Sequence, residues 1–408
     1  MLKGKTLLDY AKLVLTIGVN LQKGQGLEIA CPIEKSDIAT ALTEQAYALG
    51  AKIVRVRWEN QQIDRLNYAH ADLSALTDIP KWLVDSRNYL VEKGFCYVAV
   101  SADDPAAFKD IPAEKIGAVA KARAKALKKF SDAVMANGVR WCVVSVPTLA
   151  WAKQVFPNEK DSEQALSNAI EKAMRLDAPD PLAAWQEHIA TLEKRAEFLN
   201  YSNFEYIHFE NAKGTNLKVG LCDDHVWISA REKAKDGVHF VANIPTEEVF
   251  TAPHRLKVNG VLKSAMPLCE NGQIIDDFTI EFKDGKIINY SAKVGYETLK
   301  QLIDTDSGTK RLGEIALIGK NSPIAKLNVL FYNTLFDENA SCHLAIGKGY
   351  PTTVIDGDKL SIKELKEKGL NDASDHFDFM IGTPDLTVTG IKKDGAKIPL
   401  FKYGEWII

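Results

Sequence analysis

The stretch LEIACPIEKSDIATALTEQAYALGAKIVRVRW, residues 27–58, decides the fold of the N-terminal half of the chain. It opens with an apolar run at 27–31, continues with a helical pattern at 36–49, and ends in a second apolar run at 52–58. Ser36 and Asp37 are residue types that commonly precede or begin helices. The order predicts strand, helix, strand, which is the repeating unit of a parallel sheet covered by helices.

The same alternation continues on the C-terminal side of this stretch. Further strands are expected at 95–100 and 139–146, and a long helix at 113–137. A helix with one continuous apolar stripe is expected at 182–199, and the domain boundary is expected near it. We therefore predict an α/β N-terminal domain, with a largely parallel sheet covered by helices, over residues 1–185.

The character of the sequence changes from residue 200 onward. Short alternating segments are separated by turn signals, which indicate hairpins. These signals lie at 211–214, 235–237, 271–272, 283–285 and 393–395. Residues 186–408 are therefore expected to form an α+β C-terminal domain rich in antiparallel strands.

Composition and charge exclude several classes of function. A formal net charge of -3 argues against nucleic acid as an obligate partner, which usually leaves a basic footprint. The apolar runs are far shorter than the about 18 residues that span a bilayer. Gly24-Gln25-Gly26 precedes a strand, whereas a dinucleotide-binding fingerprint must follow one.

The N-terminus and the cysteines point to a cytoplasmic protein. Asp9 and Lys12 interrupt the first apolar segment, which favours an amphipathic helix over a signal peptide. The six cysteines form no CxxC pair and are expected to be buried thiols. Cys342, beside His343, is a weaker candidate for a ligand or nucleophile than the hard ligands near it.

The C-terminal half places metal-ligand residue types inside otherwise apolar segments. Burying so many charges is costly unless they are paired, and a metal centre is a usual partner. Two histidines with three or more carboxylates suit a pair of divalent hydrolytic ions. The candidates are Glu247, Glu248, Glu314, His343, His376 and Asp378.

Local patterns give each candidate an expected setting. His376 and Asp378 would share one face of a strand, either as ligands or as a hydrogen-bonded histidine and aspartate. Glu314 enters an apolar strand, where it is either a ligand or a solvent-facing end residue. His343 is expected in a helix that begins with Asp337 as its N-cap. That helix would end near 347–349.

Glu247 and Glu248 lie in an extended segment, where adjacent side chains point in opposite directions. One of them is therefore expected to be a ligand. The other is open to three roles: support of a ligand, general base, or anchor for a substrate amine. Tyr350 would either pack as a core aromatic or donate a hydrogen bond to a developing oxyanion.

Four motifs in this region resemble those of the aminopeptidase T and aminopeptidase S family of dinuclear metallo-aminopeptidases. They are NIPTEEVFTAP (residues 243–253), RLGEIAL (311–317), FYNTLFDENASCHLAIG (331–347) and GLNDASDHFDFMIG (369–382). The resemblance runs from about residue 243 to 391, and more loosely through the N-terminal half. The resemblance implies five metal ligands: Glu248, Glu314, His343, His376 and Asp378. It also implies a tyrosine at the metal centre, Tyr350, and a homodimer whose active sites face an internal cavity.

The resemblance and the ligand set together predict removal of N-terminal amino acids from peptides. Two divalent ions (zinc, cobalt or manganese) would share a bridging water that attacks the scissile carbonyl. Glu247 is the candidate general base, and Tyr350 would stabilise the oxyanion. The alternatives are another dinuclear hydrolase, such as an amidase or deacylase, and a peptide-binding protein with a structural metal.

Overall fold

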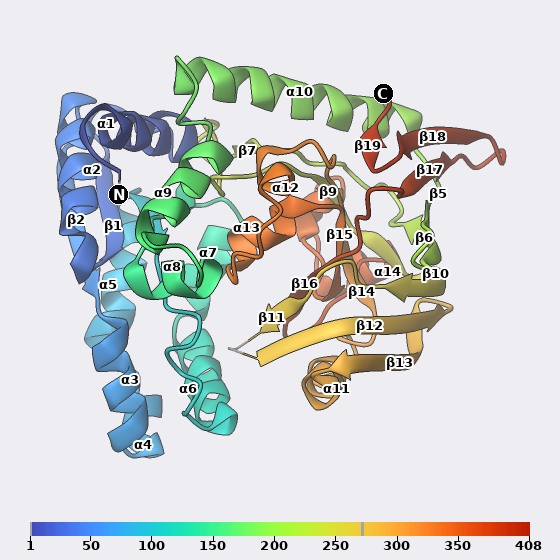
Figure 1. Cartoon of the computed structure of the whole chain (residues 1–408), viewed down its shortest axis with the longest axis horizontal. Helices are drawn as coiled ribbons and strands as arrows, with labels where there is room; N and C mark the ends of the chain where they lie inside the picture. Colours follow the sequence, from blue (N-terminus) through green and yellow to red (C-terminus); the bar gives the residue numbers. More distant parts are fainter. Residues whose placement is uncertain (1, 271–272) are drawn as a thin grey trace. The chain divides into compact units, whose positions relative to one another are not determined.

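The computed structural model describes residues 2–270 and 273–408, and its chain forms two compact units (Figure 1). The first unit holds the chain up to Glu187 together with Arg231–Pro245. The second holds His188–Ala230 and Thr246–Ile408. The sequence-based division kept residues 231–245 with the C-terminal domain, whereas here they belong to the first unit.

The first unit is built on a parallel sheet, as predicted. Its strands run in the order β2-β1-β3-β4. Their bounds are β1 (Gly26–Pro32), β2 (Ile53–Glu59), β3 (Cys96–Ser101) and β4 (Trp141–Ser145). The central strand β1 is buried from Gly26 to Cys31, which fits its run of apolar residues, while the edge strand β2 alternates between exposed and half-buried positions.

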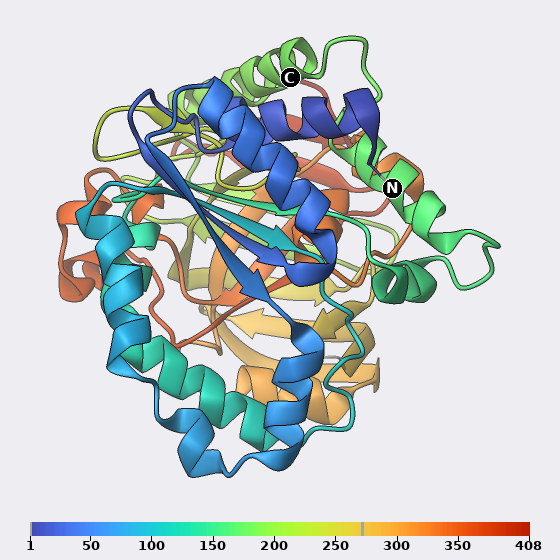
Figure 2. The same cartoon turned by 90° about the vertical axis from the view of Figure 1, so that its left-hand side faces the viewer.

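Helices of the same unit lie beside this sheet (Figure 2). They are α1 (Gly4–Leu13), continued by the π-helix η1 (Val14–Gly18), the 3-10 helix η2 (Ile33–Lys35), α2 (Ser36–Ala48), α3 (Gln61–His70), α4 (Leu73–Thr77), α5 (Lys81–Glu92), α6 (Ala113–Ala126), α7 (Lys128–Met135), α8 (Leu149–Val155) and α9 (Ser162–Ala173). Helix α10 (Pro181–Ser202) begins in the first unit and belongs to the second from His188 onward. The single helix expected over 113–137 is wrong, because Leu127 leaves the helical conformation between α6 and α7. Phe130 of α7 packs edge-on against Tyr97 of β3, with ring centroids 6.1 Å apart.

Backbone hydrogen bonds tie residues 231–245 to the first unit. The amide of Val143 in β4 donates to the carbonyl of Ala242 at 2.8 Å, and the amide of Ile244 donates to Val143 at 3.0 Å. The amide of Val241 also donates to Gly18 at 2.9 Å. The segment includes the two-residue strands β7 (Glu232–Lys233) and β8 (His239–Phe240), joined by the turn expected at 235–237.

Two sheets dominate the described part of the second unit, and the strand pairs described within them are antiparallel. The larger runs in the order β11-β12-β10-β6-β5-β17-β18-β19, with β13 beside β12. Its strands are β5 (Tyr206–Glu210), β6 (Asn216–Leu221), β10 (Pro253–Lys263), β11 (Leu268–Glu270), β12 (Gln273–Lys283), β13 (Lys286–Val294), β17 (Thr387–Ile391), β18 (Lys397–Lys402) and β19 (Glu405–Trp406).

The smaller sheet of this unit runs in the order β16-β15-β14-β9. Its strands are β9 (Val249–Thr251), β14 (Leu312–Leu317), β15 (His343–Gly347) and β16 (His376–Met380). Helices complete the unit: α11 (Tyr296–Ile303), α12 (Pro323–Leu327), α13 (Thr334–Asp337) and α14 (Ile362–Glu367), with the 3-10 helices η3 (Glu338–Ala340), η4 (Pro351–Thr353) and η5 (Gly357–Lys359).

The expected hairpins of this unit are present where the structure describes them. The turns at 211–214, 283–285 and 393–395 join β5 to β6, β12 to β13, and β17 to β18. Gly285 illustrates why one turn needs glycine: its φ is +75°, and a Cβ there would lie 1.9 Å from the carbonyl oxygen of Arg255. The turn expected at 271–272 lies outside the described residues.

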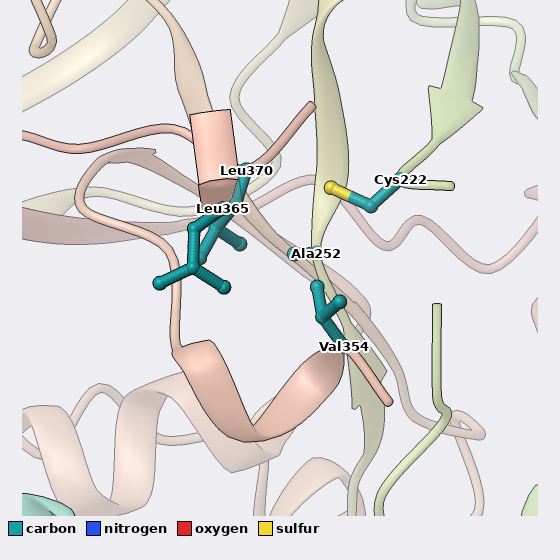
Figure 3. Packing of buried hydrophobic residues seen from close by; sticks show 5 residues of the cluster. All are labelled: Cys222, Ala252, Val354, Leu365 and Leu370. Carbon is teal, nitrogen blue, oxygen red and sulfur yellow. The ribbon is translucent and has the colours of Figure 1, made fainter. Parts of the chain in front are cut away.

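A small buried cluster joins the ends of several of these elements (Figure 3). It contains Cys222, Ala252, Val354, Leu365 and Leu370, each at most 7% exposed. Ala252 links β9 to β10, so the cluster fixes the start of the smaller sheet relative to α14.

All six cysteines are free thiols, and five of them are buried as expected; Cys269 is half-buried. Within the described residues, we find no helix with the length and apolar character needed to cross a membrane.

Candidate metal centre

Two overlapping groups of ligand-type side chains meet on the smaller sheet of the second unit. One contains Glu248, Glu314 and His343, and the other contains Glu314, His376 and Asp378. In each group the potential ligand atoms lie within 4.8 Å of one another. All five of these residues were candidates from the sequence, and the fold brings them together.

Glu314 belongs to both groups because its two carboxylate oxygens face different histidines. Its Oε1 lies 3.6 Å from Nε2 of His343, and its Oε2 lies 3.4 Å from Nε2 of His376. Glu248 Oε2 lies 3.3 Å from the first imidazole, and Asp378 Oδ1 lies 3.1 Å from the second. Glu314 therefore lies between the two groups and faces one histidine of each.

Strand register explains why these residues share a face. Glu314 of β14 pairs with Ala345 of β15, which in turn pairs with Asp378 of β16. Directly paired residues point to the same side of an antiparallel sheet, and so do residues two apart along a strand. His343 and His376 therefore project from the same face as the two carboxylates. Glu248 immediately precedes β9, the neighbour of β14.

The helix expected around His343 is wrong. His343 begins strand β15, and Asp337 precedes only the three-residue 3-10 helix η3, to which its side chain makes no capping hydrogen bond. The Asp337 carboxylate instead accepts hydrogen bonds from the amides of Phe331 (2.7 Å) and Asn333 (3.0 Å), closing the loop before α13. Pairing with β14 and β16 fixes the strand conformation, and this long-range pairing was not visible in the local pattern.

Both imidazoles are held so that the same nitrogen faces the carboxylates. His343 Nδ1 lies 2.8 Å from the carbonyl oxygen of Glu338, and His376 Nδ1 lies 2.7 Å from that of Lys348. A carbonyl accepts from an Nδ1–H, which leaves Nε2 as the ligand atom, a support commonly seen in metal sites. The donor chemistry of the cluster therefore fits a divalent metal.

The electrostatics of the cluster favour a cation. Burial lowers the pKa of His376, but Asp378 and Glu314 raise it more, to about 10. Burial also lowers the pKa of His343, and its hydrogen bonds to Glu248 and Glu314 outweigh this and raise the pKa well above the usual value. Carboxylates that hold protons this strongly on two histidines would also attract a dication to the same position.

Glu338 is a residue of this cluster that the sequence analysis missed. Its pKa is raised well above the usual value by burial and then by the charges of Asp378 and Glu248. Its Oε1 accepts a hydrogen bond from the side-chain Nδ2 of Asn339 at 3.4 Å. The sequence does show a second acidic residue beside Asp337 in the motif that contains His343. In the structure, the loop amides bind the carboxylate of Asp337 and not that of Glu338.

Glu247 and Glu248 point to different partners, in agreement with their expected opposite orientations. Glu247 is buried, and its Oε2 lies 3.6 Å from Nε2 of His188 on α10. Its amide donates to Oδ1 of Asn339 at 2.7 Å. Of the two residues, only Glu248 belongs to the ligand groups described above.

Tyr350 lies beside the cluster. Its ring centroid is 5.0 Å from that of His376 and 6.2 Å from that of Phe250. Burial, followed by the charges of Glu314 and Asp378, raises the pKa of its phenol well above the usual value.

Cys342 is not among the ligand groups described above. Its Sγ accepts a hydrogen bond from the Ile318 amide at 3.3 Å, and burial raises the pKa of its thiol to about 12.

The antiparallel unit and its cluster of carboxylates and imidazoles define a metal-dependent hydrolase. The model of the thermophilic metalloprotease family M29 matches residues 3–406, and the chain belongs to this family. This confirms the resemblance to the aminopeptidase T and aminopeptidase S family that the four motifs indicated.

Similar proteins cover nearly the whole chain. Aminopeptidase 2 of Geobacillus stearothermophilus is 42% identical over 404 residues, spanning 98% of this chain and 98% of its own. Aminopeptidase T of Thermus thermophilus is 37% identical, spanning 99% of each chain. The solved structure of wild-type AmpT from Thermus thermophilus matches with a TM-score of 0.93 at 35% identity, covering 99% of both chains. A 2,5-dihydroxypyridine dioxygenase from Pseudomonas putida matches at 10% identity with a TM-score of 0.52, a likeness of fold alone.

Proposed function

We propose that this protein is a metallo-aminopeptidase that holds two divalent ions and removes N-terminal amino acids from peptides. One observation carries the two-ion proposal: Glu314 directs its two carboxylate oxygens to two different imidazoles. Glu248 and His343 complete one site, and His376 and Asp378 complete the other. The curated relatives, named aminopeptidases, support the exopeptidase activity.

Histidine and carboxylate ligands suit zinc, cobalt or manganese. When bound, two such ions polarise a carbonyl and lower the pKa of water from about 15.7 towards about 7. Glu338, whose buried carboxyl feels the charges of the same cluster, is proposed as an additional residue of the centre. The carbonyl oxygens of Glu338 and Lys348 keep the two imidazoles oriented.

Residues of the chain supply orientation and proton transfer. The phenol of Tyr350, beside His376, is placed to donate a hydrogen bond to the oxyanion that develops from the scissile carbonyl. Glu247 is proposed as the general base that passes a proton to the leaving amine.

The role of Glu247 is tested by Glu247→Gln. Loss of a general base lowers kcat by about 10²–10⁴-fold while the metals stay bound, since Glu247 is outside both ligand groups. Glu248→Gln provides the contrast, because it should lose metal as well as activity. Near-normal kcat in a metal-loaded Glu247→Gln protein would show that Glu247 is not the base. In that case its position 3.6 Å from His188 would make it a support for the ligand loop.

The family resemblance also leads us to propose a homodimer whose active sites face an internal cavity, which would admit peptides and exclude folded proteins. Light scattering after size-exclusion chromatography would test the mass, which for a dimer is twice 45.1 kDa.

We further propose a cytoplasmic location. Six free thiols without a disulfide are typical of a reducing compartment.

The activity is tested with leucine-p-nitroanilide and its N-acetylated form, before and after chelation and with zinc, cobalt or manganese restored. The expected result is cleavage of the free-amine substrate alone, lost on chelation and recovered with metal. Cleavage of the acetylated substrate instead would identify an amidase or deacylase. Metal analysis of the same samples should give about two ions per chain, the number a two-metal site requires.

A further inference from the structure

A cavity in the second unit, separate from the candidate metal centre, has an unbalanced positive charge. Its volume is about 510 Å³. Four basic residues line it (Arg255, Lys286, Lys310 and Arg311), together with two acidic residues, Asp304 and Asp306. None of the proposed ligands lines this cavity.

Both acidic residues are already engaged by other groups. Asp304 Oδ1 lies 2.7 Å from Nζ of Lys310. The Asp306 carboxylate accepts hydrogen bonds from the amides of Gly308 (2.7 Å), Thr309 (2.9 Å) and Ser374 (2.7 Å). In the part of the chain that the structure describes, no carboxylate lies within ion-pair distance of Arg255, Lys286 or Arg311.

The two arginines are held close together and partly out of water. Arg311 Nη1 donates to the backbone carbonyl of Arg255 at 2.6 Å, which orients the Arg311 guanidinium. Burial, and then the charge of Arg255, lower the pKa of Arg311. The Nε of Arg255 is buried and has no hydrogen-bond acceptor. Like charges and an unpaired buried donor are unfavourable unless an anion joins them.

The types of basic side chain, and the separate segments that supply them, indicate which anion would fit this cavity. Arg255 lies on β10, Lys286 begins β13, and Arg311 directly precedes β14, so the positive groups come from three separate segments. Guanidinium groups bind phosphate through paired N–H donors, and lysine adds a point charge. We infer that this cavity is a binding site for a phosphate group, either as the free ion or as a phosphate ester.

Calorimetric titration of the metal-loaded protein with sodium phosphate, and separately with phenyl phosphate, tests this site. Both titrations are run against sodium chloride of equal ionic strength. The variants are Arg255→Gln and Lys286→Gln. Lys286 is exposed, so its replacement should leave the fold intact even if the arginine variant does not fold. Lys257→Gln is the matched control: it removes a cation on the same strand β10 that pairs with Asp223 at 3.7 Å and does not line the cavity.

The expected result is saturable binding to the unmodified protein and to Lys257→Gln. Lys286→Gln should weaken binding about tenfold, the effect of losing one charge-assisted contact, and Arg255→Gln should weaken it further. Binding of phenyl phosphate as well as phosphate would assign the site to esters, and binding of phosphate alone to the free ion. Equal affinity in all four proteins would place the phosphate elsewhere, for example at the metal centre, and would overturn the inference. Absence of binding to the unmodified protein would overturn it as well.

Discussion

At the scale of one residue, replacing Glu338 tests whether its carboxyl group belongs to the proposed metal centre. Glu338→Gln keeps the size of the side chain and removes a buried carboxyl group that can ionise when a cation binds beside Glu248 and Asp378. We expect metal affinity to fall by about 10–100-fold, the cost of losing a supporting or ligating group, with a matching loss of activity at limiting metal. Competition with a chelating dye would measure it.

The matched control for this variant is Glu367→Gln, an exposed glutamate at the end of α14. It changes the net charge by the same amount and should leave metal affinity unaltered. If both variants bind metal like the unmodified protein, Glu338 does not belong to the centre.

His254 provides a second test at the scale of one residue, through the pH dependence of stability. Its Nδ1 accepts a hydrogen bond from the Leu256 amide at 3.1 Å, so the folded state needs a neutral imidazole. Burial, followed by the charge of Lys257, lowers the pKa of His254, with smaller opposing and reinforcing effects of Asp223 and Arg255. The unfolded chain protonates this residue near pH about 6.5. Its stabilising contribution is therefore complete above that value and is lost as the pH falls through the lower folded pKa.

Thermal unfolding at about pH 7.5 and about pH 5.5 measures this contribution, since the interval spans the ordinary pKa of histidine. His254→Gln should show a smaller loss of Tm on acidification than the unmodified protein. His239→Gln, at an exposed position, should keep the original pH dependence. An unchanged pH dependence in His254→Gln would assign the acid sensitivity to other groups.

Residues that could be selected from the sequence were those whose chemistry is unusual for their surroundings. Glu314, His376 and Asp378 interrupt apolar segments, and each lies in the expected strand. Glu247 and Glu248 could be expected to diverge, but the family motif was needed to favour one as ligand. Glu338 could not be distinguished from Asp337, because two adjacent acids before a histidine differ only in which backbone amides the fold brings to them.

At the scale of elements, the antiparallel pair of strands β15 and β16 carries three of the proposed ligands, and Gly347 controls its geometry. Gly347 pairs with His376, has a φ of +108°, and a Cβ there would lie 2.1 Å from the carbonyl oxygen of Asp375. Gly347→Ala should destabilise the protein by at least about 1–3 kcal/mol and displace His376, which weakens metal binding. Calorimetric unfolding with and without metal would detect both effects.

Gly395→Ala separates backbone strain from this clash. Gly395 also has a positive φ, +83°, but nothing lies within 4 Å of a Cβ at that position. We expect a smaller loss of stability and unchanged metal binding. Equal effects in the two variants would show that the contact with Asp375 is unimportant.

The elements that local patterns predicted well are those whose stability depends on their own periodicity. Strands β1 to β4 and the long helix α10 lie within a few residues of their expected limits, because their apolar residues are spaced as each structure requires. The helix expected at His343 failed because its glycines and acidic start resembled helix ends. Pairing across β14, β15 and β16 decided the conformation instead.

At the scale of the whole molecule, the second unit concentrates charge that only a cation balances well, so metal removal should weaken this unit in particular. Glu248, Glu314, Asp378 and Glu338 gather around two imidazoles on the smaller sheet. Ligands that bind only the folded state stabilise it by about 2.7 kcal/mol at one hundred times their Kd. Chelation should therefore lower Tm and loosen β14, β15 and β16.

Hydrogen exchange read peptide by peptide locates this loosening. After chelation, amides of β14 to β16 should exchange faster. Readdition of zinc, cobalt or manganese should restore their protection. The ion that best supports activity should restore the most protection. Amides of β1 and β3 serve as the internal reference, because they belong to the parallel sheet of the first unit, which carries none of the proposed ligands. If chelation leaves β14 to β16 as protected as before while activity is lost, the ions act in the reaction without stabilising the sheet. The carboxylates would then have to be neutralised by protons on His343 and His376, whose raised pKa values make that exchange of a dication for protons possible.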